Sequence, residues 1–268
     1  MSTLAPPQKV IITGASSGIG EALAVCFAAK GAALGLAARS VDKLDQLAQR
    51  LREDYAVQVE TIALDIQDQA AIPVALEALI QRLGGLDIIV ANAGITGIRR
   101  SGRDPLSVDF AIFQTNLFGA ITTLDVATRY FLKQGHGHLV GMSSFSAFAP
   151  IPGSAAYTSS KAALTNYMNA MRLELLDKQI AVTVIHPGFI NTHIAPKMDK
   201  YPFVINADVA AKEMVAAIAR KQVNVIVPAL PWRLAKGLLQ HMPDSVMGFM
   251  VQRMMKKPTP RTPPKKTL

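Results

Sequence analysis

The sequence predicts a doubly wound α/β fold, with about seven parallel strands and helices on both faces of the sheet. Short apolar runs alternate with helix-length amphipathic segments along most of the chain, and half of the 268 residues are apolar. This rhythm favours parallel pairing through right-handed crossovers. No internal repeat or flexible linker divides the body. We therefore expect one domain over residues 1–230, with ligands bound at the carboxyl ends of its strands.

The expected strands are runs rich in β-branched and apolar residues, and the clearest helices have apolar residues three and four apart. The strands lie near residues 9–13, 32–38, 57–64, 86–92, 137–144, 181–187 and 223–228. The helices include residues 21–30, 42–52, 70–83 and 155–177.

The composition changes after Pro228, where the chain becomes rich in Leu and Met. Residues 231–257 are expected to form a helical extension, with a first helix between Pro231 and Pro243 and a second that ends near Lys256. The apolar face of the second helix would be covered by the protein itself, by a second subunit, by a membrane surface or by a greasy substrate. Residues 258–268 read as a disordered, basic, proline-rich tail, which predicts peripheral contact with anionic lipid.

The net charge of +9 does not indicate a nucleic-acid partner, because five of the cations lie in the C-terminal run. The folded body is only mildly basic and carries no nucleic-acid-binding motif, so no such partner is expected. With no signal-like leader or membrane-length apolar run, the expected location is the cytoplasm. The single cysteine, Cys26, excludes an internal disulfide and is read as a small core residue. The histidines show no metal-ligand spacing, so no metal is proposed; His193 is read as incidental.

A glycine-rich turn, "VIITGASSGIGEALA", lies between the first expected strand and helix. Gly14 suits unusual backbone torsions, and Gly18 and Gly20 would let a pyrophosphate approach the start of the helix. A plain tight turn is the alternative. The cofactor residues expected here are Gly14, Ser16, Ser17, Gly18, Ile19 and Gly20.

A tyrosine and a lysine stand four residues apart in "SAAYTSSKAAL", among small residues. At this spacing Tyr157 and Lys161 share one helical face. Taken alone, the pair could be two exposed helix residues without a function.

Six elements of the sequence together resemble the short-chain dehydrogenase/reductase family: "TGASSGIG", "NAG" at 92–94, Asn116, "SS" at 143–144, "YTSSK" at 157–161 and "PGFINT" at 187–192. The resemblance covers roughly residues 8–228. It implies a single Rossmann-type domain, a nicotinamide dinucleotide cofactor, and a homo-oligomer, dimer or tetramer. The catalytic residues that it implies are Asn116, Ser144, Tyr157 and Lys161, with Ser143 in support.

The resemblance gives the tyrosine and lysine a chemical task, because carbonyl reduction needs a proton at oxygen as hydride reaches carbon. Tyrosine has an ordinary pKa of about 10, and an ammonium ~4 Å away could lower it by 2–3 units. We therefore expect Lys161 to lower the pKa of Tyr157 and, as in the family, to hold the nicotinamide ribose. Ser144 would bond the substrate oxygen, and Asn116 would hold a water linked to the lysine. Singly, these residues could equally be ordinary helix and turn residues.

The resemblance assigns further cofactor contacts. Asn92 would brace the central strand, with Ala93 and Gly94 near the adenine ribose. Asp65 would meet the adenine, although a helix cap is its alternative. The nicotinamide would be held by Pro187, Gly188, Ile190 and Thr192.

Cofactor choice is expected at "LAARS", where dinucleotide-binding proteins that prefer NAD carry an acidic residue. Arg39 offers a planar fork to a ribose phosphate and Ser40 adds a hydroxyl. NADP(H) is therefore favoured, against Arg39 as an ordinary surface charge.

The segment after Ser144 carries bulk at Phe145 and Phe148, which could either shape an apolar pocket or pack the core. The function predicted is an NADP(H)-dependent oxidoreductase that interconverts a carbonyl and an alcohol on a small, apolar substrate. The alternatives are a non-catalytic dinucleotide sensor or scaffold, and a C=C reductase or epimerase on the same fold.

Overall fold

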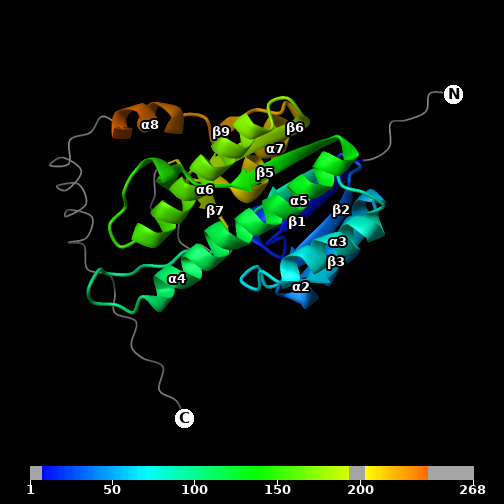
Figure 1. The fold of residues 1–268 in the computed structure, drawn as a ribbon, viewed down its shortest axis with the longest axis horizontal. Coiled ribbons are helices and arrows are strands. Elements are labelled where there is room, and N and C mark those ends of the chain that lie inside the picture. The colour runs from blue at the N-terminus through cyan, green and yellow to red at the C-terminus, as the bar shows by residue number, and fades with distance from the viewer. Residues whose placement is uncertain (1–7, 193–202, 241–268) are drawn as a thin grey trace, which may run out of the picture.

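The computed structural model describes residues 8–192 and 203–240, and its centre is one seven-stranded sheet (Figure 1). The strands pair in the order β3-β2-β1-β4-β5-β6-β9, and every pair is parallel. Their bounds are β1 Lys9–Thr13, β2 Ala33–Ala38, β3 Val59–Ala63, β4 Ile88–Ala91, β5 His136–Met142, β6 Gln179–Pro187 and β9 Asn224–Val227. All seven expected strands are present, which confirms the predicted fold class.

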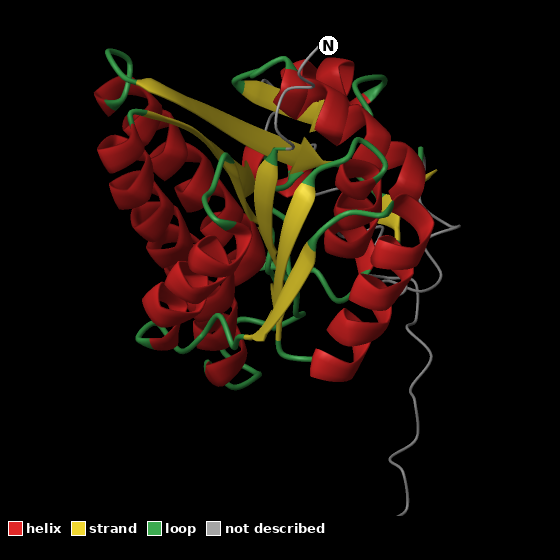
Figure 2. Cartoon of the chain, turned by 90° about the vertical axis from the view of Figure 1, so that its right-hand side faces the viewer, coloured by secondary structure: helices red, strands yellow, loops and turns green. Residues whose placement is uncertain are grey.

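Helices cover both faces of the sheet, which Figure 2 shows nearly edge-on between two helical layers. One layer holds α1 (Gly18–Ala28), α2 (Val41–Tyr55) and α7 (Ala207–Ala219). The other holds α3 (Ala71–Leu83), α5 (Ala120–Gln134) and α6 (Ala155–Glu174). Successive strand residues feed the two cores alternately: Val10 and Ile12 face the first, Ile11 the second. A strand buried on both faces has no polar side, which explains the continuous apolar runs in the sequence.

The chain reverses direction across the sheet at β1 and β4. It runs outward from β1 through β2 to β3, then returns to β4 on the other side of β1. Such a switch point opens a crevice at the carboxyl ends of the two strands. Gly14 follows β1 and Asn92 follows β4, so both predicted cofactor segments flank this crevice.

A long helical stretch, Ser107–Gln134, joins α4 (Ser107–Phe113), a π-helical turn η1 (Gln114–Gly119) and α5. By length and composition it could cross a membrane. Leu124 and Phe131 are, however, fully buried in the core between the sheet and the layer of α3, α5 and α6. We interpret the stretch as a core helix.

The remaining elements lie near the end of the described chain. Two short strands, β7 (Ile190–Asn191) and β8 (Ile205–Asn206), form a small parallel sheet that the sequence did not predict. Helix α8 (Trp232–Gln240) occupies the interval expected for the first C-terminal helix. The second expected helix, the basic tail and the residues His193 and His241 lie outside the described residues.

Candidate active site

The glycines in the turn after β1 let neighbouring backbone approach closely. Gly14 has a φ of +66°, and a Cβ added there would lie 2.7 Å from the Cα of Ala93. A Cβ on Gly20 would lie 2.3 Å from the carbonyl oxygen of Gly14. Ser17 precedes α1 without a side-chain capping bond, so the first N–H groups of the helix stay available to an anion. Ser16 and Ile19, like Ser17, are half-buried along this turn. The space left by the glycines beside these free N–H groups fits a dinucleotide phosphate.

A hydrogen-bonded brace ties this turn to β4. The Thr13 hydroxyl accepts from the backbone N–H groups of Asn92 and Ala93, at 3.1 and 3.2 Å. The Asn92 side-chain amide donates to the carbonyls of Thr13 and Gly14, at 2.9 and 3.2 Å. The brace expected of Asn92 is therefore present. Sequence reasoning missed Thr13, although a threonine directly before the first turn glycine could have pointed to it.

Asn116 lies fully buried in the π-helical turn η1. Its Oδ1 accepts from the N–H of Ile95 at 2.8 Å, and its Nδ2 donates to the Ile95 carbonyl at 2.9 Å. Nδ2 also lies 3.4 Å from the hydroxyl of Ser160 on α6, a contact that sequence reasoning missed. π-Helical turns are frequent at functional sites. Here the turn fixes the loop after β4 to α6, and the water predicted for Asn116 stays a prediction.

Lys161 is only 4% exposed, and its ammonium docks on the end of β5. Nζ donates to the carbonyl of Met142 at 2.7 Å. A Cβ on Gly94 would lie 3.5 Å from Nζ and 3.3 Å from Oδ1 of Asn116, so the glycine leaves room between them. Burial lowers the pKa of Lys161 to about 8. The lysine is therefore still mainly charged at neutral pH.

Tyr157 is half-buried on α6, one turn before Lys161. Burial raises the pKa of Tyr157, and only a hydrogen bond with the Ser144 side chain opposes this shift. The lowered pKa expected from Lys161 is thus wrong for this structure. The physical cause is burial, which disfavours the charged phenolate; the Lys161 ammonium, held by the Met142 carbonyl and 6.0 Å from the centre of the tyrosine ring, does not offset it.

The two serines after β5 act differently. The Ser143 hydroxyl donates to the Lys161 carbonyl at 3.0 Å and shares a 2.7 Å hydrogen bond with Thr165, so it anchors α6 as expected of a supporting residue. The Ser144 hydroxyl accepts from the N–H and the hydroxyl of Ser146, at 3.2 and 2.9 Å. With its lone pairs occupied, Ser144 has its own hydrogen left to donate toward Tyr157 or a ligand oxygen.

The residues expected at the adenosine end lie exposed at the carboxyl ends of β2 and β3. Arg39 and Ser40 follow β2, and Arg39 makes no hydrogen bond or ion pair with the described part of the chain. Asp65 accepts from the backbone N–H of Gln67 at 3.0 Å, as a turn-capping residue does. Its contact with adenine stays a prediction.

The segment predicted to hold the nicotinamide leaves β6 at Pro187 and enters β7 at Ile190, and both residues are buried. Gly188 and Thr192 are half-buried. Phe145 is 8% exposed and packs with Ile226 and Trp232, whereas Phe148 is only partly buried beside them. Phe145 therefore packs into a small third core, separate from the cores on the two faces of the sheet.

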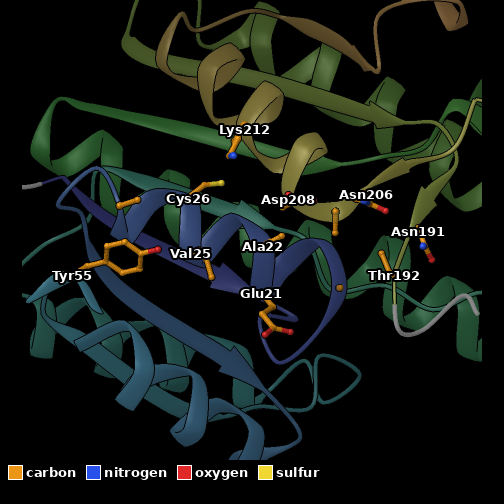
Figure 3. A pocket seen from close by; sticks show the side chains of 13 residues that line it. Glu21, Ala22, Val25, Cys26, Tyr55, Asn191, Thr192, Asn206, Asp208 and Lys212 are labelled. Carbon is orange, nitrogen blue, oxygen red and sulfur yellow. The ribbon is translucent and has the colours of Figure 1, made fainter. Parts of the chain in front are cut away.

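A cavity of about 740 Å³ lies beside this site, between α1 and α7 (Figure 3). It shares Gly18 and Thr192 with the predicted cofactor residues and extends past Lys212 to Tyr55, but none of the four predicted catalytic residues lines it. Cys26 lines this cavity as well. The expectation of a plain core residue was therefore only partly right, because Cys26 packs on the core but opens to the cavity.

The described histidines make ordinary structural contacts. His138 is buried, with Nε2 2.8 Å from the hydroxyl of Thr183, and desolvation lowers its pKa to about 4. His186 is also buried, with Nδ1 3.4 Å from the carbonyl of Ser144. Across residues 8–192 and 203–240, no three His, Cys, Asp or Glu side chains gather as a metal site would require.

Comparison with known proteins points to one family. The family model for short chain dehydrogenase matches residues 8–201. An uncharacterized oxidoreductase of Mycobacterium tuberculosis is 36% identical over 227 residues, which cover 84% of this chain and 90% of that protein. The 11-beta-hydroxysteroid dehydrogenase 1A of Arabidopsis thaliana is 34% identical over 243 residues, covering 83% of this chain and 68% of that protein.

Among solved structures, the alcohol dehydrogenase of the archaeon Thermococcus sibiricus, complexed with 5-hydroxy-NADP, superposes with a TM-score of 0.75. It is 28% identical, and the match covers 82% of this chain and 94% of that one. The family match spans most of the chain, and the parallel sheet, glycine turn and buried lysine agree with it. This chain is a member of the short-chain dehydrogenase/reductase family of oxidoreductases.

Proposed function

We propose that the protein is an NADP(H)-dependent oxidoreductase that interconverts a ketone or aldehyde with an alcohol. The observation that carries the proposal is the convergence of Asn116, Ser144, Tyr157 and Lys161 from three separate elements beside the glycine turn. Gly94 leaves the space between Asn116 and Lys161, and the Ser144 side chain bonds Tyr157. A scaffold that only held a dinucleotide would not need the tyrosine and serine.

The bound nicotinamide would supply the hydride, and the chain's own residues would manage the proton. A phenol with a raised pKa is protonated at neutral pH, so Tyr157 is ready to donate its proton to a carbonyl oxygen. When substrate binds, the Ser144 hydroxyl would turn its hydrogen from Tyr157 to the same oxygen and hold it in place. Lys161 brings a positive charge to the site, which favours the negative charge that develops on that oxygen. These properties favour the reductive direction.

The cofactor proposal rests on the exposed guanidinium of Arg39 at the end of β2, which pairs with no residue in 8–192 or 203–240. An arginine can hold a ribose phosphate with two parallel hydrogen bonds, and Ser40 beside it adds a hydroxyl. No acidic side chain occupies these two positions to repel a phosphate. We therefore place NADP(H) ahead of NAD(H).

The substrate proposed is a small-molecule carbonyl or alcohol of apolar character, because the ring of Phe148, which is only partly buried, lies four residues after Ser144. The Arabidopsis relative is named for a steroid substrate, which is in keeping with this class. We also propose a cytoplasmic homo-oligomer whose C-terminal tail contacts anionic membranes peripherally. The exposed side chains of Phe110 on α4 and Phe118 on η1 support an interface between subunits.

The function is tested by following NADPH oxidation with a panel of aliphatic, aromatic and steroid carbonyls. Tyr157→Phe removes only the proton donor, so turnover should fall at least about a hundredfold while NADPH still binds. The control is Tyr167→Phe, which removes an exposed phenol from the same helix and should leave the rate unchanged. If Tyr157→Phe kept more than about a tenth of the rate, the tyrosine would not be the proton donor.

If the protein bound NADPH but turned over no carbonyl in the panel, the non-catalytic sensor would replace this proposal.

A further inference from the structure

Trp232, the sole tryptophan of the chain, opens α8 and is buried in an aromatic cluster. Its ring centre lies 4.5 Å from that of Phe145 and 5.2 Å from that of Phe189. Phe145 is the residue after Ser144, and Phe189 lies within the segment predicted to hold the nicotinamide. Trp232 therefore contacts both the segment that carries Ser144 and the segment predicted to hold the nicotinamide.

The indole N–H of Trp232 faces Gly188. A Cβ added to Gly188 would lie 2.6 Å from Nε1, so the indole occupies the space that a side chain there would fill. Nε1 is buried and has no hydrogen-bond partner in the described part of the chain. A buried donor without a partner costs stability. The position of the indole against Gly188 is therefore set by the packing of its ring and not by a hydrogen bond of its nitrogen.

Helix α8 makes a second contact with the segment after Ser144. Lys236 lies one turn beyond Trp232 on the same helical face, and its Nζ is 4.2 Å from the centre of the Phe148 ring. Phe148 in turn packs on His186 at 4.6 Å, and Nδ1 of His186 lies 3.4 Å from the Ser144 carbonyl. Residues 145–148 are therefore held by α8 at both ends of the segment.

We propose that Trp232 is a positioning residue for the reaction: it sets the Gly188–Phe189 segment at a fixed distance from the segment that carries Ser144. This inference rests on the proposed function. Hydride must reach the carbonyl carbon while Ser144 bonds the carbonyl oxygen, so the segment that holds the nicotinamide and the segment that carries Ser144 have to keep a fixed relative position. A displacement of about 1 Å in such a site can reduce the rate about a hundredfold.

The first test separates positioning from binding. Trp232→Ala should lower kcat about ten- to a hundredfold at saturating NADPH and carbonyl, with a smaller effect on NADPH affinity. Trp232→Phe keeps most of the ring packing and should recover most of kcat. Leu234→Ala is the matched control, because Leu234 lies on the exposed face of the same helix. Circular dichroism and thermal melting verify that each variant folds.

The second test is a double-mutant cycle with Gly188→Ala. The added Cβ meets the indole nitrogen, so Gly188→Ala should lower kcat strongly with tryptophan present and add much less loss in the Trp232→Ala background, where the ring is gone. Equal losses in both backgrounds would mean that the glycine serves the ligand alone, which would overturn the proposal. A higher KM at unchanged kcat for Trp232→Ala would also overturn the proposal, because the residue would then serve binding alone.

A third measurement needs no substrate and stays informative if no carbonyl is turned over. Reduced nicotinamide absorbs where tryptophan emits and oxidised nicotinamide does not, so NADPH should quench the single tryptophan far more than NADP⁺. Equal, weak quenching by both bound cofactors would place Trp232 away from the nicotinamide and overturn the proposal. Failure of both cofactors to bind would instead contradict the proposed function.

Discussion

The two ends of β5 each hold a buried basic side chain, and they differ in charge. At the amino end, burial lowers the pKa of His138 to about 4; at the carboxyl end, burial lowers that of Lys161 to about 8. Thr183 donates its hydrogen to the Gln222 carbonyl at 2.6 Å, so it accepts from Nε2–H of a neutral His138. Near neutral pH, therefore, the histidine is an uncharged structural donor and the lysine keeps its charge. Similar burial thus leaves one of the two basic groups neutral and the other charged.

The largest change expected from this comparison is at Lys161. Lys161→Met fills a similar volume without a charge, so turnover should fall below detection and NADPH affinity should drop more than about tenfold. The free energy of unfolding should stay the same or rise, because a buried charge is no longer desolvated. Chemical denaturation and cofactor titration together check this. A variant that lost stability but still bound NADPH would show that Lys161 is structural like His138.

The next effect concerns the amino end and its dependence on pH. Below pH 6.5 the His138 side chain binds a proton in the unfolded chain, but in the folded protein, where its pKa is about 4, it stays neutral. Stability is therefore lost as pH falls from 6.5 to 4, by up to about 3 kcal/mol from this residue. His138→Gln should flatten that part of the curve, measured by urea unfolding at several pH values. His136→Gln, at the exposed start of the same strand, is the control and should change the curve far less.

The smallest effect is a matter of cofactor choice at another carboxyl end, that of β2. Arg39→Ala removes a charge-assisted bond worth roughly 1.5–3 kcal/mol, so NADPH affinity should fall about ten- to a hundredfold. NADH affinity should not change, because NADH has no phosphate there. Titration of both cofactors measures the difference. Equal affinities in the unmutated protein would make Arg39 an ordinary surface charge.

The parts of the site that could be predicted from sequence are those encoded by neighbouring residues. The strand before Gly14, the glycines and the helix after them form one local unit, and the spacing of Tyr157 and Lys161 fixes their shared face. The tripeptide at 92–94 likewise predicted that Asn92 would hydrogen-bond neighbouring backbone. Local geometry leaves few other arrangements for such patterns.

The parts that could not be predicted depend on which distant segments meet. The sign of the Tyr157 pKa shift is set by burial of the tyrosine, which depends on how α6 packs against the segments around it. The cluster of Phe145, Phe189 and Trp232 joins three segments far apart in the chain, and no periodicity links them. The two-residue strands β7 and β8 are too short to leave a pattern.

The π-helical turn at Gln114–Gly119 has a consequence for engineering the chain. A π-turn amounts to an α-helix with one residue inserted, so removing a residue from this turn would let α4 and α5 join as one regular helix. The remaining residues on one side would then rotate by about 100° relative to the other. Asn116 would swing away from Ile95, and the loop after β4 would lose both of its side-chain hydrogen bonds. Deletion of a single codon here would thus leave a regular helix but remove Asn116 from its place beside Ile95.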